Sequence, residues 1–219
     1  KSALPSPNLD LYRRLMKKGT GLVFLHNYYP ALTGSLYIKD DNIAGSAMLV
    51  RHLAEQGHTS IGGIFKTDDL QSIERYQGFI ETMRSLHLNI SDEKIGWFDS
   101  RDQFSLEKEK DSSFLRKIAG EALSSCTAVV CYNDMIAFYL LRELRLAGYH
   151  LPEDMAVAAF DNTYLSNYGP LSITTLSHKP HEMGTLAAMT MVRRLKGLPA
   201  SPQEVPWKLN LKGSTNFTV

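Results

Sequence analysis

Residues 127–162 read TAVVCYNDMIAFYLLRELRLAGYHLPEDMAVAAFDN, and this stretch decides the fold. A short apolar run at 128–131, rich in β-branched residues, predicts a buried strand. Residues 132–134 supply capping side chains for a helix that Gly148 can end. A second apolar run at 155–160 ends on a polar turn. Strand, turn, helix, strand and turn in this order predict a βαβ unit with a right-handed crossover.

Both polar turns of this unit lie at the carboxyl ends of parallel strands. Asn133 follows the first strand, and Asp161 follows the second. Open α/β sheets bind their ligands in the crevice outside these strand ends. We therefore expect Asn133 and Asp161 to lie near each other and to face one cleft.

Short apolar runs alternate with amphipathic stretches along the rest of the chain. Strands are expected at 21–25, 36–38, 61–65, 95–98, 173–176 and within 207–219, and helices at 7–18, 43–55, 66–87, 105–123 and 180–195. Such alternation is typical of the α/β class with parallel sheets. The sequence contains no internal repeat and no low-complexity segment.

Composition limits the classes of function. The 219 residues include 24 Lys and Arg against 23 Asp and Glu, a net charge of +1, and this balance gives no support to a nucleic-acid-binding face. No apolar stretch approaches the roughly 20 residues needed to cross a bilayer, so no membrane contact is expected. The first residues lack the apolar core of a signal peptide. Cys126 and Cys131 are interpreted as buried free thiols, which favours a cytoplasmic location.

The chemistry that an enzyme requires is missing from the sequence. There is no Gly-rich phosphate loop and no Gly-x-Ser-x-Gly elbow. Ser105 and Lys108 fit a Ser-x-x-Lys pattern, but they fall on a charged helix without the companion motifs. His178 and His181 lack the Cys or carboxylate neighbours that would complete a metal site. We therefore expect no catalysis, no metal and no cofactor.

Polar and aromatic side chains instead follow several strands in turn. Such groups around a cleft suit a polyhydroxylated ligand, because each sugar hydroxyl both donates and accepts while an aromatic ring covers the C–H face. The candidate ligand-binding residues are His26, Tyr28, Lys66, Asp69, Gln71, Arg75, Phe98, Asn133, Asp161 and His178. Asp69 and Asn133 can also be explained as helix caps. Arg75 can be an exposed helix residue, and Phe98 can belong to the core.

Several motifs follow one another in a specific order and spacing. They are Asp40-Asp41 with Gly45, Gly57-His58-x-x-Ile61, Arg75-x-x-Gly78-Phe79, Cys131-Tyr132-Asn133-Asp134, Pro152-x-Asp154-Met155-Ala156-Val157, Phe160-Asp161 and Ile173-Thr174-Thr175-Leu176. Together they resemble the effector-binding region of the lactose/galactose-repressor family. The resemblance implies a fold like that of periplasmic binding proteins. It also implies that Arg75, Asn133 and Asp161 contact the effector.

A further motif narrows this resemblance. Gly63-Ile64-Phe65-Lys66-x-Asp68-Asp69-x-Gln71 is similar to the arabinose-responsive repressors. That likeness implies L-arabinose as effector, with Lys66, Asp69 and Gln71 as added contacts. It also implies a full-length homodimer that reaches operator DNA only through a winged-helix head of the gluconate-repressor type. In such proteins the sugar closes the cleft and shifts the relative angle of two subdomains.

The chain departs from the family pattern in its extent. No DNA-binding head is present, and residue 1 falls midway through the family's first subdomain. We expect a truncated first subdomain at 1–38 and 177–200 and a second at 39–176 and 201–219, joined by three crossovers. The alternative that the sequence leaves open is a periplasmic sugar-binding protein of a transport system, which has the same fold class and no DNA role.

Overall fold

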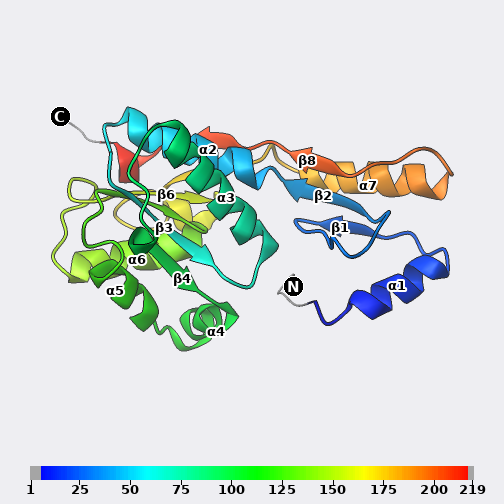
Figure 1. The fold of residues 1–219 in the computed structure, drawn as a ribbon, viewed down its shortest axis with the longest axis horizontal. Helices are drawn as coiled ribbons and strands as arrows, with labels where there is room; N and C mark the ends of the chain where they lie inside the picture. Colours follow the sequence, from blue (N-terminus) through cyan, green and yellow to red (C-terminus); the bar gives the residue numbers. More distant parts are fainter. Residues whose placement is uncertain (1–5, 217–219) are drawn as a thin grey trace.

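The computed structural model describes residues 6–216, which form two lobes joined side by side (Figure 1). The smaller lobe comprises residues 6–40 and 178–205, and the larger lobe comprises residues 41–177 and 206–216. Each lobe is built on its own sheet. The chain passes between the lobes three times, directly after Asp40, Ser177 and Val205.

Helices and strands alternate as the sequence predicts. The strands are β1 Val23–Leu25, β2 Leu36–Asp40, β3 Ile61–Lys66, β4 Ile95–Phe98, β5 Ala128–Cys131, β6 Ala156–Phe160, β7 Thr174–Ser177, β8 Gln203–Val205 and β9 Lys208–Asn210. The α-helices are α1 Leu9–Lys17, α2 Asn42–Glu55, α3 Leu70–Ser85, α4 Ser100–Phe104, α5 Ser113–Gly120, α6 Asp134–Leu146 and α7 Glu182–Leu195. No helix among residues 6–216 is long and apolar enough to span a bilayer.

The two sheets differ in size. The smaller sheet has the order β1-β2-β8 and is parallel throughout. The larger sheet has the order β4-β3-β5-β6-β7-β9, and only β9 at its edge is antiparallel. Both faces of β5 and β6 are buried, which accounts for their continuous apolar sequences. These features confirm the α/β class with two parallel sheets.

Most of the apolar core belongs to the larger lobe. One core, which includes Phe65 and Phe79, lies between the sheet and the pair of helices α2 and α3. The other includes Ile136 and Leu140 and lies under α5 and α6. The smaller lobe has a much smaller core, made of Ile38, Met183 and Val205 with a few partly buried neighbours. Helix α1 contributes no buried residue.

The charged stretch 105–123 is not one continuous helix, and this part of the sequence-based expectation is wrong. Helix α4 begins earlier, at an Asp99 capping box, and is followed by a π-helical turn at 105–109. Lys110 then adopts a left-handed conformation, with φ of 60°, and α5 starts at Ser113. The break lets Ser112 donate a hydrogen bond of 2.6 Å to the buried carboxylate of Glu143.

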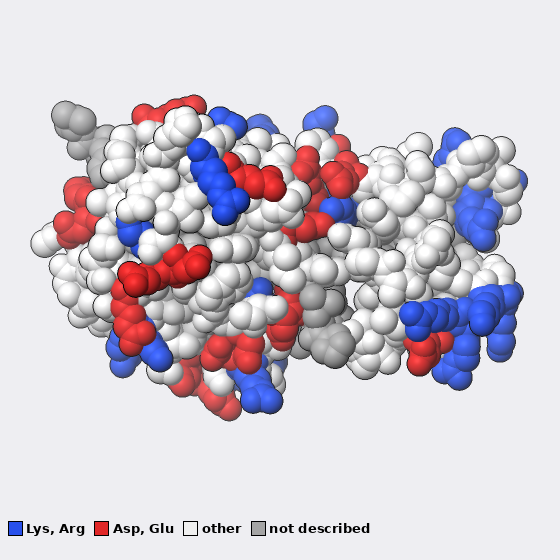
Figure 2. Space-filling model, viewed as in Figure 1, with Lys and Arg blue, Asp and Glu red and all other residues white. Residues whose placement is uncertain are grey.

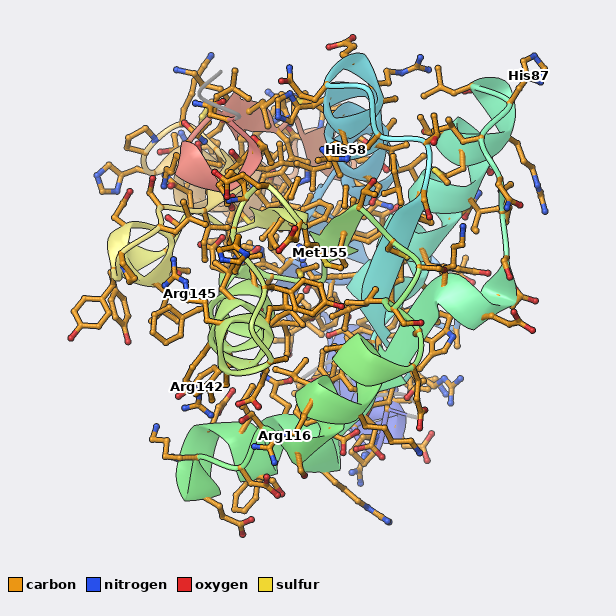
Figure 3. The ribbon with its side chains drawn as sticks, turned by 90° about the vertical axis from the view of Figure 1, so that its left-hand side faces the viewer. His58, His87, Arg116, Arg142, Arg145 and Met155 are labelled. Carbon is orange, nitrogen blue, oxygen red and sulfur yellow. The ribbon has the colours of Figure 1, made fainter. Side chains whose placement is uncertain are left out.

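Glu143 also joins α5 to α6. Its carboxylate accepts hydrogen bonds of 3.0 Å from the side chains of Arg116 and Arg142. Figure 3 labels both arginines at the contact between these helices. The three donors hold the pKa of Glu143 below its usual value, although burial alone would raise it.

The end of the chain also differs from expectation. Strand β8 pairs with β2 and therefore belongs to the smaller sheet, whereas the sequence assigned residues 201–219 to the larger subdomain. Within the described residues 207–216 only β9 is a strand, and residues 213–215 form a short 3-10 helix. Residues 217–219 lie outside the described part of the chain.

Candidate functional site

A polar cavity of about 360 Å³ lies where the two lobes meet. The larger lobe contributes residues at the carboxyl ends of β5 and β6 and in the first turns of α3. The smaller lobe and the crossovers contribute the last residue of β2 and residues that follow β1, β7 and β8. The side chains that line the cavity are His26, Asp40, Gln71, Arg75, Tyr132, Asp161, His178 and Trp207.

Arg75 is the buried cation of this cavity. Its side chain is only 3% exposed, and its guanidinium donates to Asn42 Oδ1 at 3.0 Å and to the carbonyl oxygen of Tyr132. The guanidinium also lies over the ring of Phe160, 4.1 Å from the ring centroid. These contacts hold its remaining donor toward Asp161, which lies 3.4 Å away. A buried arginine held in one orientation is suited to fork onto ligand oxygens.

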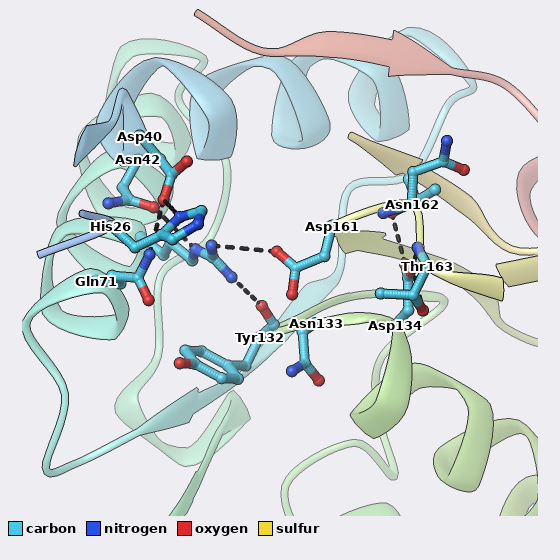
Figure 4. Close-up of polar contacts among 12 residues, drawn as sticks. His26, Asp40, Asn42, Gln71, Tyr132, Asn133, Asp134, Asp161, Asn162 and Thr163 are labelled. Carbon is cyan, nitrogen blue, oxygen red and sulfur yellow. Dashed lines mark hydrogen bonds and ion pairs between the residues drawn. The ribbon is translucent and has the colours of Figure 1, made fainter. Parts of the chain in front are cut away.

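Asp161 is held at the end of β6 in a backbone conformation that few residues adopt. Its φ is 97°, and its amide donates to the carbonyl of Leu176 on the next strand. The side chain remains 36% exposed, on the cavity. Burial raises the pKa of the Asp161 carboxyl, and the positive charge of Arg75 opposes that rise. In Figure 4, Asp161 lies opposite His26, Asp40 and Gln71 across the site.

Asp40 is the second carboxylate of the cavity, but its oxygens are already occupied. Its side chain is 1% exposed and accepts from His178 at 2.7 Å, from Gln71 at 2.7 Å and from His26 at 3.1 Å. Burial would raise the pKa of Asp40, but the hydrogen bonds from the two histidines prevail and keep it well below its usual range. Asp161 is therefore the carboxylate that remains available to a ligand.

His178 connects all three crossovers. It follows β7, its Nε2 lies 2.7 Å from Asp40 at the end of β2, and its Nδ1 lies 2.9 Å from the carbonyl oxygen of Pro206 after β8. Its ring also stacks on Trp207, with 3.8 Å between ring centroids. A carbonyl and an ionised carboxylate only accept, so both ring nitrogens donate and His178 is positively charged. Its pKa is accordingly raised by Asp40 against the opposing effect of burial.

Asp134 supports the loop that carries Asp161. This fully buried carboxylate accepts from the backbone and hydroxyl of Thr163 and from the hydroxyl of Thr175 at 2.6 Å. Burial raises the pKa of Asp134 to about 6, against the effect of these hydrogen bonds. The network ties the start of α6 to β7 and to the loop after β6, as Figure 4 illustrates for Thr163.

Comparison with known proteins identifies this arrangement. A family model for the periplasmic binding protein-like domain matches residues 50–215. The chain belongs to that family. Its fold, with a polar cavity at the junction of two parallel-sheet lobes, agrees with the assignment.

Individual relatives narrow the likeness. An "Arabinose metabolism transcriptional repressor" of Halalkalibacterium halodurans is 31% identical over 192 residues, which are 88% of this chain and 50% of that protein. A protein of the same name from Geobacillus stearothermophilus is 30% identical over 90% of this chain and 53% of its own length. The chain thus spans about half the length of these curated relatives. The matches confirm the resemblance to effector-binding domains of the lactose/galactose-repressor family, and with it the prediction of a non-enzymatic domain.

A solved structure has the same fold. It is a LacI family transcriptional regulator from Enterococcus faecium with bound ribose. The TM-score is 0.79 at 21% identity, and the match covers 95% of this chain and 75% of that one. At this level of identity the likeness establishes the fold alone.

The structure brings five of the ten predicted ligand-binding residues of this family member to the cavity and places five elsewhere. Those at the cavity are His26, Gln71, Arg75, Asp161 and His178. Two others do not line the cavity but lie next to Tyr132, which does. Asp69 caps α3 and accepts a hydrogen bond of 3.0 Å from the hydroxyl of Tyr132, and Asn133, the next residue in the chain, caps α6.

The remaining three predicted residues are directed elsewhere. Phe98 is 2% exposed and packs in the core against Phe114, because β4 buries it there. Lys66 is buried and pairs with Asp68 at 3.6 Å. Tyr28 packs on Tyr37 outside the cavity. In the described structure none of these three lines the cavity.

Three cavity residues were missed from the sequence: Asp40, Tyr132 and Trp207. Asp40 and Asp41 both precede the predicted helix at 43–55 and are of a residue type that caps helices, but only Asp41 caps it, and Asp40 is the last residue of β2. Tyr132 carries a signal that could have found it, since it directly follows β5 at the predicted binding edge. Trp207 had no such signal, because its position depends on the third crossover.

Proposed function

We propose that this chain is the sugar-sensing domain of a cytoplasmic transcriptional repressor, with L-arabinose as its effector. The observation that carries the proposal is the pairing of Arg75 with Asp161 at a polar cavity between two lobes. An arginine that only donates and a carboxylate that only accepts can together bind neighbouring hydroxyls of one sugar. Trp207 offers an aromatic face on the same cavity.

The cavity is suited to a small ligand. Its volume of about 360 Å³ lies at the lower end of the roughly 300–1,000 Å³ that is usual for ligand pockets. Its donors and acceptors come from both lobes, so a bound sugar would contact both. Because the contacts differ between open and closed arrangements of the lobes, sugar binding can favour the closed arrangement. In a repressor this change would reach the DNA-binding head of the full-length protein.

The choice of L-arabinose rests on the two curated relatives, whose names assign them to arabinose metabolism. The sequence also left open a periplasmic sugar-binding protein of a transport system. The relatives reported above are regulators of transcription, which favours the repressor. A coding segment for a winged-helix head upstream of Lys1 would distinguish the two.

Calorimetric titration of the chain with pentoses tests the proposal. We expect saturable binding of L-arabinose and at least tenfold weaker binding of its mirror image D-arabinose, because the enantiomer cannot match the same donors and acceptors. D-ribose, D-xylose and D-galactose complete the panel. Tighter binding of another sugar would reject arabinose and keep the sensor, whereas no binding of any sugar at millimolar concentration would overturn the proposal.

A further inference from the structure

The charged residues are segregated between the lobes. Among the described residues, the smaller lobe has nine Lys and Arg against four Asp and Glu, and the larger lobe has fourteen against nineteen. The described residues, whose charges sum to zero, therefore divide into one lobe of +5 and one of −5, and the net charge of +1 for the whole chain includes Lys1, which lies outside them. The charge of the whole chain conceals this separation, because the opposite excesses cancel.

The positive excess gathers at one end of the smaller lobe (Figure 2). Four of its residues lie on α1 or directly after it, and three lie at the end of α7. All seven are exposed. We call this surface the basic end; it consists of Arg13, Arg14, Lys17, Lys18, Arg193, Arg194 and Lys196.

The two groups of basic residues lie next to each other. Helix α1 leads through Gly21 into β1, and α7 packs against that strand. A methyl group added to Gly21 would lie 3.8 Å from the side chain of Arg194. The segment that leaves α1 therefore passes beside the end of α7, so both groups of positive charges lie at the same end of the smaller lobe.

Few of these charges are compensated within the described chain. Arg13 lies 3.0 Å from the exposed carboxylate of Asp10, and no carboxylate lies within 4.0 Å of the other six in residues 6–216. A simpler role is open to some of them, because cations in the last turn of a helix interact favourably with its dipole. One or two residues per helix suffice for that, and Lys18 and Lys196 lie beyond the helix ends.

We propose that the basic end is a docking surface for the phosphate backbone of duplex DNA. The proposal rests on the proposed function, since a repressor holds its effector domain close to DNA when its head is bound. DNA is the matching polyanion, with one negative charge per about 1.7 Å of helix axis. Phosphate contacts position a protein on the duplex without reading its sequence. The basic end would thus add affinity and orientation, while specificity stays with the head.

The test is binding of the 219-residue chain to a fluorescent 24-base-pair duplex, followed by anisotropy over a range of salt concentrations. Each phosphate contact contributes about −0.9 to the slope of log K against log salt concentration. We expect a slope between about −3 and −6 for the unmodified chain. The variant with Arg13, Arg14, Lys17 and Lys18 changed to Gln should lose up to about 3.6 of this slope.

A matched control removes the same charge from the larger lobe. Its four exposed residues are Arg84, Arg101, Lys108 and Lys117, each changed to Gln. The control should bind the duplex about as tightly as the unmodified chain and with the same salt slope, because its residues make no phosphate contact. Changing Arg193, Arg194 and Lys196 to Gln should weaken binding as the α1 variant does. Both basic-end variants should keep their sugar affinity, so that a failure of DNA docking and a failure of sugar sensing are distinguishable.

Four outcomes would overturn the docking surface. The chain could fail to bind the duplex at 50 mM salt. The control could weaken binding as much as the basic-end variants do. Vesicles containing phosphatidylserine could be bound more tightly than the duplex through the same residues, which would make the basic end a lipid-binding surface. A basic-end variant that only loses thermal stability, with an unchanged slope, would assign these residues to the helix dipoles instead.

Discussion

Both the stability of the chain and its sugar affinity should depend on the absence of a side chain at Gly78. It lies on α3, one turn after Arg75, where α3 meets the start of α2. A methyl group at Gly78 would overlap the carbonyl oxygen of Ile43 and lie 2.8 Å from its Cα. Because these are backbone atoms, the two helices would have to separate by roughly 1 Å to restore ordinary contact.

The magnitude follows from two opposing effects. Overpacking of this kind costs about 1–3 kcal/mol, whereas replacing Gly by Ala inside a helix gains roughly 0.5–1 kcal/mol. We expect Gly78→Ala to lower the free energy of unfolding by about 1–2 kcal/mol and the melting temperature by about 2–8 °C. The shift also disturbs the 3.0 Å bond between Arg75 and Asn42, so the sugar affinity should fall at least fivefold.

Gly184→Ala in α7 is the matched control, because nothing lies within 4 Å of the added methyl group. It should gain up to about 1 kcal/mol in unfolding free energy and leave sugar binding unchanged. Urea unfolding measures the stabilities, and calorimetric titration measures the affinities. If Gly78→Ala proved as stable as Gly184→Ala, the close approach of α2 and α3 would not have the role assigned to it.

Three further changes test the site. Asp161→Asn should weaken sugar binding at least tenfold in calorimetry, because a charge-assisted hydrogen bond contributes about 1.5–3 kcal/mol. The melting temperature should not change, because asparagine tolerates the positive φ of this position. Equal sugar affinities of the two proteins would remove Asp161 from the site. The folded pKa of His178 is raised, so its stabilising effect is complete below the unfolded pKa of about 6.5 and is lost as pH rises through the folded pKa. Unfolding free energy should therefore fall less between pH 6 and 8 in His178→Gln than in the unmodified chain, and parallel pH profiles would contradict its charge. Asp134 has a folded pKa of about 6, so the unmodified chain should lose up to about 3 kcal/mol of unfolding free energy between pH 4 and 7 that Asp134→Asn does not lose. Urea unfolding at both pH values measures this difference, and equal losses in the two proteins would contradict the raised pKa.

The larger sheet was predictable because its strands are apolar on both faces and are followed by polar turns. Strand β8 escaped prediction since Gln203-Glu204-Val205 has one buried apolar residue at the edge of a small sheet. The break between α4 and α5 was also missed. Helical periodicity persists across it, while the buried Glu143, whose carboxylate Ser112 reaches because of the break, lies on a different element.

Asp161 was predictable at this site because it directly follows a buried strand of the larger sheet. The site was unpredictable where two neighbouring residues compete for one role. Whether Asp40 or Asp41 caps α2 depends on the pairing of β2 with β8, which places Asp40 opposite Val205 within the sheet. Net charge likewise could not indicate the basic end, because a sum over the chain contains no information on where the charges lie.

The unequal cores of the lobes have a consequence for hydrogen exchange. With Ile38, Met183 and Val205 as its only fully enclosed apolar cluster, the smaller lobe should open locally at a lower free energy than the larger one. Amides of β1, β2 and β8 should then exchange with solvent before those of β5 and β6. A sugar that contacts both lobes would raise the free energy of this opening by about 2.7 kcal/mol at a concentration of 100 times its dissociation constant. Exchange rates in the smaller lobe would therefore report effector binding.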